Sequence, residues 1–206
     1  MEKEVLSDYK KYFVDKINEF GATPKGVDYN SFNSQEIRFR ELAKCIDEKS
    51  NFSILDFGCG YGAMLEYLHK NYTNFDYTGC DIIEEMITSA REKNKNFPDA
   101  KWETQLTENK TYDYTIACAI FNYKLTIDNP AWTKHVIQTL STINRISEKG
   151  FSFNMLTSYS DKELMRDDLY YADPLFFFDY CKKNFSKNVA LLHDYKLYDF
   201  TIIVRK

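Results

Sequence analysis

The sequence predicts an α/β domain in which a mostly parallel β-sheet carries helices on both faces. Three observations support this fold class. Apolar runs of strand length alternate with helical periodicity over residues 52–156, a glycine-rich turn joins the first strand to a helix, and two β-rich runs near the C-terminus form a hairpin. Such alternation is typical of a parallel sheet with helices on both sides. A length of 206 residues suits one globular domain.

Composition favours a compact protein and limits its partners. Hydrophobic residues make up 44% of the chain, and seven glycines and four prolines are too few for a disordered segment of that length. A net charge of −4 gives no general attraction to nucleic acid or to an anionic membrane, so neither is expected as a partner. The sequence has neither a membrane-spanning run nor the apolar core of a signal peptide, and we therefore expect a cytoplasmic protein.

The five cysteines are widely spaced, at Cys45, Cys59, Cys80, Cys118 and Cys181, and form no Cys-x-x-Cys pair. Their spacing indicates neither a zinc site nor a disulfide framework, and no metal is expected. Buried reduced thiols are the simpler interpretation, because free cysteine behaves as a small apolar residue.

The N-terminal segment is predicted to be an amphipathic helix followed by a loop. Gly21 is the stop signal of the helix. Residues 21–34 are either a surface connection or a lid over a ligand. We therefore divide the chain into a helix and lid segment, 1–33, and a main domain, 34–206. The apolar residues at helical spacing are Val5, Leu6, Tyr9, Tyr12, Phe13, Ile17 and Phe20.

The main domain begins with a helix from Ser34 to about Asp47, with Gln35 and Arg38 facing a cleft. Ligands bind beyond the carboxyl ends of parallel strands, so the polar residues at those ends are candidate site residues. The elements that follow are strand 52–57, helix 62–70, strand 76–81, helix 83–95, strand 100–103, strand 112–120, helix 131–147, strand 150–156, a helix near 175–184 and the hairpin over 188–204.

The strongest chemical signal is the run from Phe52 to Gly62, which indicates a strand, a tight turn and a helix. Gly58, Gly60 and Gly62 let the backbone bend sharply and let a ligand approach it closely. The helix N-terminus offers free N–H groups to a carboxylate or phosphate. The glycine spacing by itself leaves a dinucleotide possible.

Two carboxylates favour S-adenosylmethionine (SAM) over a dinucleotide. Asp56 precedes the first glycine by two residues, where it would repel a pyrophosphate but could face the sulfonium and ammonium groups of SAM. Asp81 ends the next strand, where it can accept hydrogen bonds from both ribose hydroxyls. Glu103 either contacts the adenine or is a plain loop carboxylate. The predicted cofactor-binding residues are Asp56, Gly58, Cys59, Gly60, Gly62, Asp81, Ile82, Glu103 and Ala119.

The run Ile54–Gly62 together with Asp81 resembles motifs I and II of the class I SAM-dependent methyltransferases. The resemblance covers roughly residues 34–206, the catalytic domain. It implies a Rossmann-like, mostly parallel seven-stranded sheet with an antiparallel C-terminal hairpin strand, and SAM as cofactor. A NAD(P)-dependent oxidoreductase is the alternative, disfavoured by Asp56 and by the hairpin. A non-catalytic SAM-binding regulator is the third possibility.

The acceptor side offers fewer signals. Methyl transfer needs alignment of the acceptor and removal of its proton. His193 is either the base or a structural residue, and Arg166 either binds the acceptor or is solvated. The chain lacks the Asn/Asp-Pro-Pro-Tyr signature of amino-group methylation and an acidic metal-binding cluster, which favours O-methylation without a metal. The candidate catalytic residues are His193, Asn122 and Tyr170, and the candidate acceptor-binding residues are Asp28, Tyr29, Arg166 and Tyr171.

Three segments, 26–30, 165–174 and 192–195, together resemble a bacterial subgroup of methyltransferases associated with surface-polysaccharide assembly. This resemblance implies a small-molecule acceptor, namely a sugar, a nucleotide-linked sugar or a phosphorylated precursor. It indicates neither the acceptor atom nor the oligomeric state.

Overall fold

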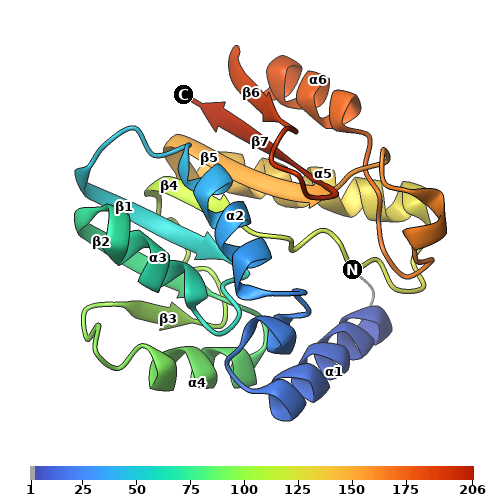
Figure 1. Cartoon of the computed structure of the whole chain (residues 1–206). Helices are drawn as coiled ribbons and strands as arrows, with labels where there is room; N and C mark the ends of the chain where they lie inside the picture. Colours follow the sequence, from blue (N-terminus) through green and yellow to red (C-terminus); the bar gives the residue numbers. More distant parts are fainter. Residues whose placement is uncertain (1–2) are drawn as a thin grey trace.

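The structure is a computed structural model that describes residues 3–206, with side chains described from Ser7 onward. The side chains of Val5 and Leu6, expected on the apolar face of the first helix, lie outside the described residues. One seven-stranded sheet forms the centre of the molecule (Figure 1). Its strands are β1 (Ser50–Phe57), β2 (Thr73–Cys80), β3 (Lys101–Glu103), β4 (Tyr112–Ala117), β5 (Ser147–Leu156), β6 (Asn188–Leu192) and β7 (Asp199–Arg205), in the order β3-β2-β1-β4-β5-β7-β6.

The C-terminal hairpin gives the sheet its mixed character. Strands β1 to β5 pair in parallel, whereas β7 is antiparallel to both β5 and β6 and lies between them. Ile202 of β7 lies opposite Phe153 of β5 and Leu191 of β6. The predicted fold class, with an antiparallel final strand inserted beside a parallel one, is confirmed.

Helices cover both faces of the sheet, and the alternation of side chains along each strand supplies both cores. Ile202 of β7 packs in the core beneath α5 and α6, and the next residue, Ile203, packs in the core beneath α2 and α3. Figure 1 shows these two layers on opposite sides of the sheet. The helices are α1 (Lys3–Phe20), η1 (Pro24–Val27), α2 (Phe32–Ala43), α3 (Ala63–Asn71), α4 (Glu84–Lys93), α5 (Asn129–Ile146), η2 (Lys162–Leu164) and α6 (Pro174–Asn184).

Helix α1 lies across the carboxyl edge of the sheet and ends as the sequence predicts. Gly21 takes a left-handed φ of 62° and donates its N–H to the Ile17 carbonyl at 2.8 Å, which closes the last turn. Phe13 and Ile17 pack against Tyr61 and Met86. No helix within residues 3–206 is long and apolar enough to cross a membrane.

Several element boundaries differ from the prediction by a few residues, and those of α2 and β4 have a clear local cause. Helix α2 begins at Phe32, because the Ser31 side chain accepts the Ser34 N–H at 3.1 Å and forms a capping box with that residue, and the helix ends at Ala43. Strand β4 ends at Ala117 rather than near residue 120. Ala119 has a φ of 59°, which a strand cannot accommodate, so the chain turns away from the sheet there.

Candidate active site

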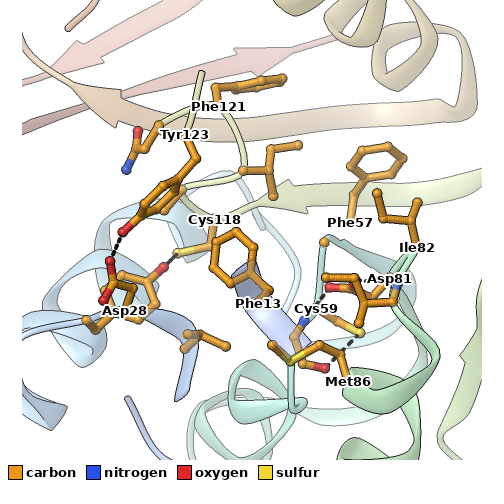
Figure 2. A pocket seen from close by; sticks show the side chains of 18 of the residues that line it. Phe13, Asp28, Phe57, Cys59, Asp81, Ile82, Met86, Cys118, Phe121 and Tyr123 are labelled. Atoms are coloured by element: carbon orange, nitrogen blue, oxygen red, sulfur yellow. Dashed lines mark hydrogen bonds between the residues drawn. The ribbon is translucent and has the colours of Figure 1, made fainter. Parts of the chain in front are cut away.

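A cavity of about 820 Å³ lies at the carboxyl edge of the sheet, beneath α1. Segments that follow β1, β2, β3 and β4 line it, together with α1, residues 27–30 and parts of α2 and α5. Its size is in the range of small-molecule sites. Figure 2 shows Asp28, Cys118 and Tyr123 on one side of Phe13 and Cys59, Asp81 and Met86 on the other. We call the first side the acceptor half and the second the cofactor half.

The glycine turn forms the floor of the cofactor half. The N–H groups of Gly58 and Cys59 donate to the Cys80 carbonyl at 2.8 and 3.1 Å, which ties the turn to the end of β2. Gly58 has a φ of 78°, and a Cβ there would lie 2.3 Å from Ile120 Cγ2. A larger residue would therefore be strained and would also displace the loop after β4.

Asp81 connects the glycine turn to the loop after β2. Its Oδ2 accepts the Gly60 N–H at 2.9 Å, and its Oδ1 accepts the Ile83 N–H at 3.0 Å. Burial raises its pKa to about 6, although these hydrogen bonds favour the charged form. Each oxygen keeps a lone pair, so the carboxylate can still accept from the two hydroxyls of a ribose.

Asp56, at the end of β1, is 2% exposed and accepts the Tyr77 hydroxyl at 2.7 Å. Burial, and to a lesser degree the charge of Asp81, raises its pKa to about 7, while the Tyr77 hydrogen bond opposes the rise. Two carboxylates in one buried site are poorly compatible unless a cation compensates their charge. The cofactor half therefore fits a ligand that carries a positive charge and a ribose, and SAM has both.

The acceptor half has a polar cluster at its edge, which we call the Asp28 cluster: Tyr12, Lys16, Asp28 and Tyr123. The Asp28 carboxylate accepts hydrogen bonds from the Tyr12 hydroxyl at 2.8 Å, the Lys16 ammonium at 2.8 Å and the Tyr123 hydroxyl. Burial alone would raise the pKa of the Asp28 carboxyl group. The three hydrogen-bond donors outweigh this effect, and the pKa is lowered. The cluster joins the N-terminal segment to the loop after β4.

Tyr29 and Cys118 lie beside the Asp28 cluster. The Tyr29 hydroxyl and the Cys118 sulfur are hydrogen bonded at 3.0 Å, and the Arg38 guanidinium lies 5.1 Å from the centre of the Tyr29 ring. Burial raises the pKa of Cys118 to about 12 and raises that of Tyr29 as well. Both groups are therefore neutral hydrogen-bonding partners near pH 7.

Three polar side chains, which we call the polar relay, connect the cavity to the core: Arg38, which lines the cavity, and the buried Asp199 and Asn154. Arg38 pairs with the Asp199 carboxylate, which also accepts from Asn154 Nδ2 at 2.8 Å. Asn154 Oδ1 in turn accepts the Ala119 N–H at 2.8 Å. The relay thus holds Ala119 in its left-handed conformation at the boundary between the two halves, where a non-glycine residue needs such support.

Comparisons with known proteins agree with this geometry. The profile of a family described as "Methyltransferase domain" matches residues 54–146, from the first strand through α5. The chain is also 47% identical to "Putative methyltransferase Rv1506c" of Mycobacterium tuberculosis over 163 residues, which are 79% of this chain and 98% of that protein. The chain belongs to the class I SAM-dependent methyltransferases. The NAD(P)-dependent oxidoreductase alternative is thereby set aside.

Solved methyltransferases share the fold of this methyltransferase at low identity. Magnesium protoporphyrin IX methyltransferase from Synechocystis PCC 6803, with bound S-adenosylhomocysteine (SAH), gives a TM-score of 0.68 at 15% identity, with both chains covered in full. DhpI in a complex with SAM and HEP gives 0.69 at 12% identity, again with full coverage of both. Because the chain belongs to a SAM-dependent family, SAM is its cofactor, and the predicted cofactor is confirmed.

Most of the predicted site residues of the methyltransferase line the cavity. Ile82 is 43% exposed there, which leaves an apolar surface for the adenosine to cover. Asn122 is buried, and its Oδ1 accepts the Leu156 N–H at 3.1 Å, so part of its role is to hold two loops together. The predicted residues in the cavity lining are Asp56, Gly58, Cys59, Gly60, Asp81, Ile82 and Ala119 of the cofactor set, Asn122 of the catalytic set, and Asp28, Tyr29 and Arg166 of the acceptor set.

Two residues of the predicted cofactor set lie outside the cavity lining. Gly62 precedes α3 with a φ of 75°, and Trp102 lies where its Cβ would be, so it shapes the turn without facing the ligand. Glu103 accepts hydrogen bonds from Thr107 at 3.0 Å and Lys110 at 3.3 Å, which fits the loop-carboxylate interpretation. Residues 104–106 line the cavity in its place.

Three residues of the predicted acceptor and catalytic sets also lie outside the lining. The Tyr170 hydroxyl is hydrogen bonded to Thr133 of α5 at 2.7 Å, and the Tyr171 hydroxyl accepts the Arg166 N–H at 3.0 Å. His193 is exposed beyond the end of β6 and packs against Tyr159, with ring centres 5.8 Å apart. The hairpin carries His193 away from the cavity because β6 is the outermost strand, two positions from β5.

Sequence reasoning missed several residues that line the cavity. Tyr9 and Phe13 of α1 have the spacing of ordinary core residues, and the sequence contains no signal that the helix would lie over the site. His135 of α5 lies within a helical stripe and has its pKa lowered by burial. Cys118 and Tyr123 are the direct chain neighbours of two predicted site residues in the loop after β4, Ala119 and Asn122.

Proposed function

We propose that this methyltransferase transfers the methyl group of SAM to a hydroxyl group of a small polar acceptor. The acceptor class is a sugar, a nucleotide-linked sugar or a phosphorylated precursor in surface-polysaccharide synthesis. The observation that carries the proposal is the saturated Asp28 cluster, whose carboxylate accepts from Lys16, Tyr12 and Tyr123. Polar groups that are already charge-balanced favour a neutral polar ligand.

The charge balance supports a hydroxyl over an amine. Lys16 lies 2.8 Å from the Asp28 carboxylate, and Arg166, 3.9 Å from Asp28, is also paired with Asp168. Two cations and two carboxylates leave no net negative charge at this end of the cavity to attract an ammonium group. Arg166 could bind a phosphate group on the acceptor. Its side chain is half exposed and could leave Asp168 to pair with the phosphate.

The chemical step needs alignment first. SAM supplies an activated methyl group, and the protein has to hold the acceptor oxygen in line with it while water is kept out. The rings of Phe13 and Tyr123 pack edge to face, with their centres 5.2 Å apart. Together they cover the cavity at the boundary between its halves. The Tyr29 hydroxyl and Cys118 thiol, both neutral, can orient the acceptor hydroxyl by hydrogen bonding.

His135 is our candidate for the group that takes the acceptor proton. It lines the cavity, and burial lowers its pKa, so the neutral imidazole that can accept a proton is present at pH 7. His193, the histidine predicted from the sequence, is exposed and outside the lining. Replacement of each by glutamine separates the two: we expect His135→Gln to slow turnover by about 10²-fold and His193→Gln to leave it unchanged.

The proposed reaction can be tested with a matched pair of acceptors. Methyl β-glucoside and its 2-amino analogue differ in one group, and transfer from radiolabelled SAM is counted for both, followed by product analysis. The proposal predicts O-methylated product from the glucoside. Transfer to nitrogen alone would contradict it, and the balanced charge of the Asp28 cluster would then need another explanation.

A further inference from the structure

We infer that the acceptor of this methyltransferase carries an apolar arm, alkyl or aryl, next to the hydroxyl that receives the methyl group. The inference rests on the proposed hydroxyl methylation and adds to it the chemistry of the rest of the acceptor. Its basis is a set of apolar side chains that share the acceptor half with the Asp28 cluster. We call them the apolar wall: Phe13, which lies at the boundary between the two halves, and Leu156, Leu164 and Leu169.

The apolar wall adjoins the Asp28 cluster directly. The ring centres of Phe13 and Tyr123 lie 5.2 Å apart, and Leu169 forms an antiparallel β-bridge with Tyr123. Leu164 and Leu169 flank Arg166 in the chain, so the segment from η2 to Leu169 presents apolar and cationic side chains to the same cavity. A ligand that reaches the polar groups therefore also lies against apolar ones.

The side chains of the apolar wall are more exposed than those of an ordinary core. Leu164 is 61% exposed although it lines the cavity, and Leu156 and Leu169 are only partly buried. Core residues of the neighbouring strands are almost fully buried, as Phe153 and Met155 are at 0%. The apolar wall thus keeps surface that a ligand can remove from water, and a bare sugar has little apolar surface to offer in return.

The backbone holds this surface in place. The N–H groups of Lys124 and Leu125 both donate to the Asp168 carbonyl, at 3.1 and 3.0 Å, and the Tyr170 N–H donates to the Asn122 carbonyl at 2.8 Å. The segment after β5 is therefore fixed to the loop after β4. A preformed apolar surface binds an apolar group without the entropic cost of ordering a loop.

The test compares octyl β-glucoside with methyl β-glucoside by calorimetric titration of the SAH-loaded protein, below the micelle-forming concentration. We expect the octyl compound to bind about tenfold tighter or more, because its chain is the only apolar addition. Leu164→Ala should reduce that ratio by roughly threefold. Leu175→Ala is the matched control, since Leu175 is 59% exposed but lies on α6 outside the cavity lining.

Several results would overturn the inference: equal dissociation constants for the two glucosides, no binding of either, or the same loss in Leu175→Ala as in Leu164→Ala. Unchanged SAH affinity in both variants checks that they fold. Methyl transfer, measured separately, distinguishes this inference from the proposed function. Transfer to both glucosides without any preference in binding would retain hydroxyl methylation and remove the apolar arm. Preferential binding of the octyl compound without transfer would retain the arm and remove the glucoside hydroxyl as acceptor.

Discussion

The two halves of the cavity are built in different ways. Two short runs, 56–60 and 80–83, supply the floor of the cofactor half, and both follow strands that lie side by side in the sheet. The acceptor half is assembled from α1, residues 27–30, the loop after β4 and the segment after β5, which are far apart in the chain. A local motif can therefore specify cofactor binding, whereas acceptor binding depends on how distant segments pack.

The polar relay extends from Arg38, beside Tyr29, to Ala119 at the boundary between the halves, and its removal should have the largest effect. The Asp199 side chain is 0% exposed and the Arg38 side chain 12% exposed. Asp199→Ala leaves the Arg38 charge buried without its partner, so we expect the free energy of unfolding to fall by about 3–5 kcal/mol. Urea denaturation measures this change. The exposed Asp179→Ala, on α6, is the control, and an equal loss there would contradict a special role for the relay.

Asp81→Ala should break the cofactor half while it leaves the acceptor half folded. The substitution removes two backbone hydrogen bonds. It also removes the charge-assisted contact that we expect with the ribose, so SAH affinity should fall by about 1.5–3 kcal/mol, or roughly 10- to 150-fold. Calorimetric titration gives the value. The Asp76→Ala variant, which removes an exposed carboxylate on the preceding strand β2, should bind SAH normally. Unchanged affinity in Asp81→Ala would remove Asp81 from the site.

The pH dependence of SAM binding should report the charge of Asp56 in the cofactor half. Because the folded pKa of Asp56 is raised to about 7, its neutral form stabilises the cofactor-free protein below pH 4, and this contribution is lost as pH rises through 7. We expect SAM to bind the carboxylate form, because its sulfonium and ammonium groups are cationic, so its affinity should fall roughly tenfold from pH 8 to pH 6. Asp56→Asn should flatten the profile. A profile that stays steep in this variant would assign the proton to another group, such as Asp81.

Tyr123→Phe should have the smallest effect and should be confined to the acceptor half. It removes one of the three donors to Asp28 and leaves the ring in place. We expect KM for the acceptor to rise about two- to tenfold, with SAH affinity unchanged. Steady-state kinetics and calorimetry on the same preparation give both values. A matching loss of SAH affinity would show that the two halves are not separable.

The fold and the cofactor half could be predicted from the sequence because their signals are local. Gly58, Gly60 and the carboxylates Asp56 and Asp81 each lie within a few residues of a strand end, and alternation of strands and helices fixes the sheet. The antiparallel position of β7 followed from the hairpin pattern together with the family resemblance. Boundary errors arose where a single residue overrode the pattern, as the left-handed Ala119 does at the end of β4.

The acceptor half could be predicted only in part, for a physical reason. Asp28, Tyr29 and Arg166 line the cavity as expected, but His193 does not, because strand order alone does not tell how far a hairpin carries its turn from the neighbouring strands. The placement of Phe13 over the site depends on the packing of α1 against Met86 and Tyr61. No periodicity in the sequence encodes that contact.

We expect the cofactor and the acceptor to occupy separate, adjoining halves of one cavity. A crystal structure of the complex with SAH would show whether they do. The ribose hydroxyls should lie on Asp81, and the sulfur should face Tyr29, Cys118 and Tyr123. If the SAH sulfur pointed away from these three residues, the two-halves arrangement would be wrong, and the acceptor would have to approach from another side of the sheet edge.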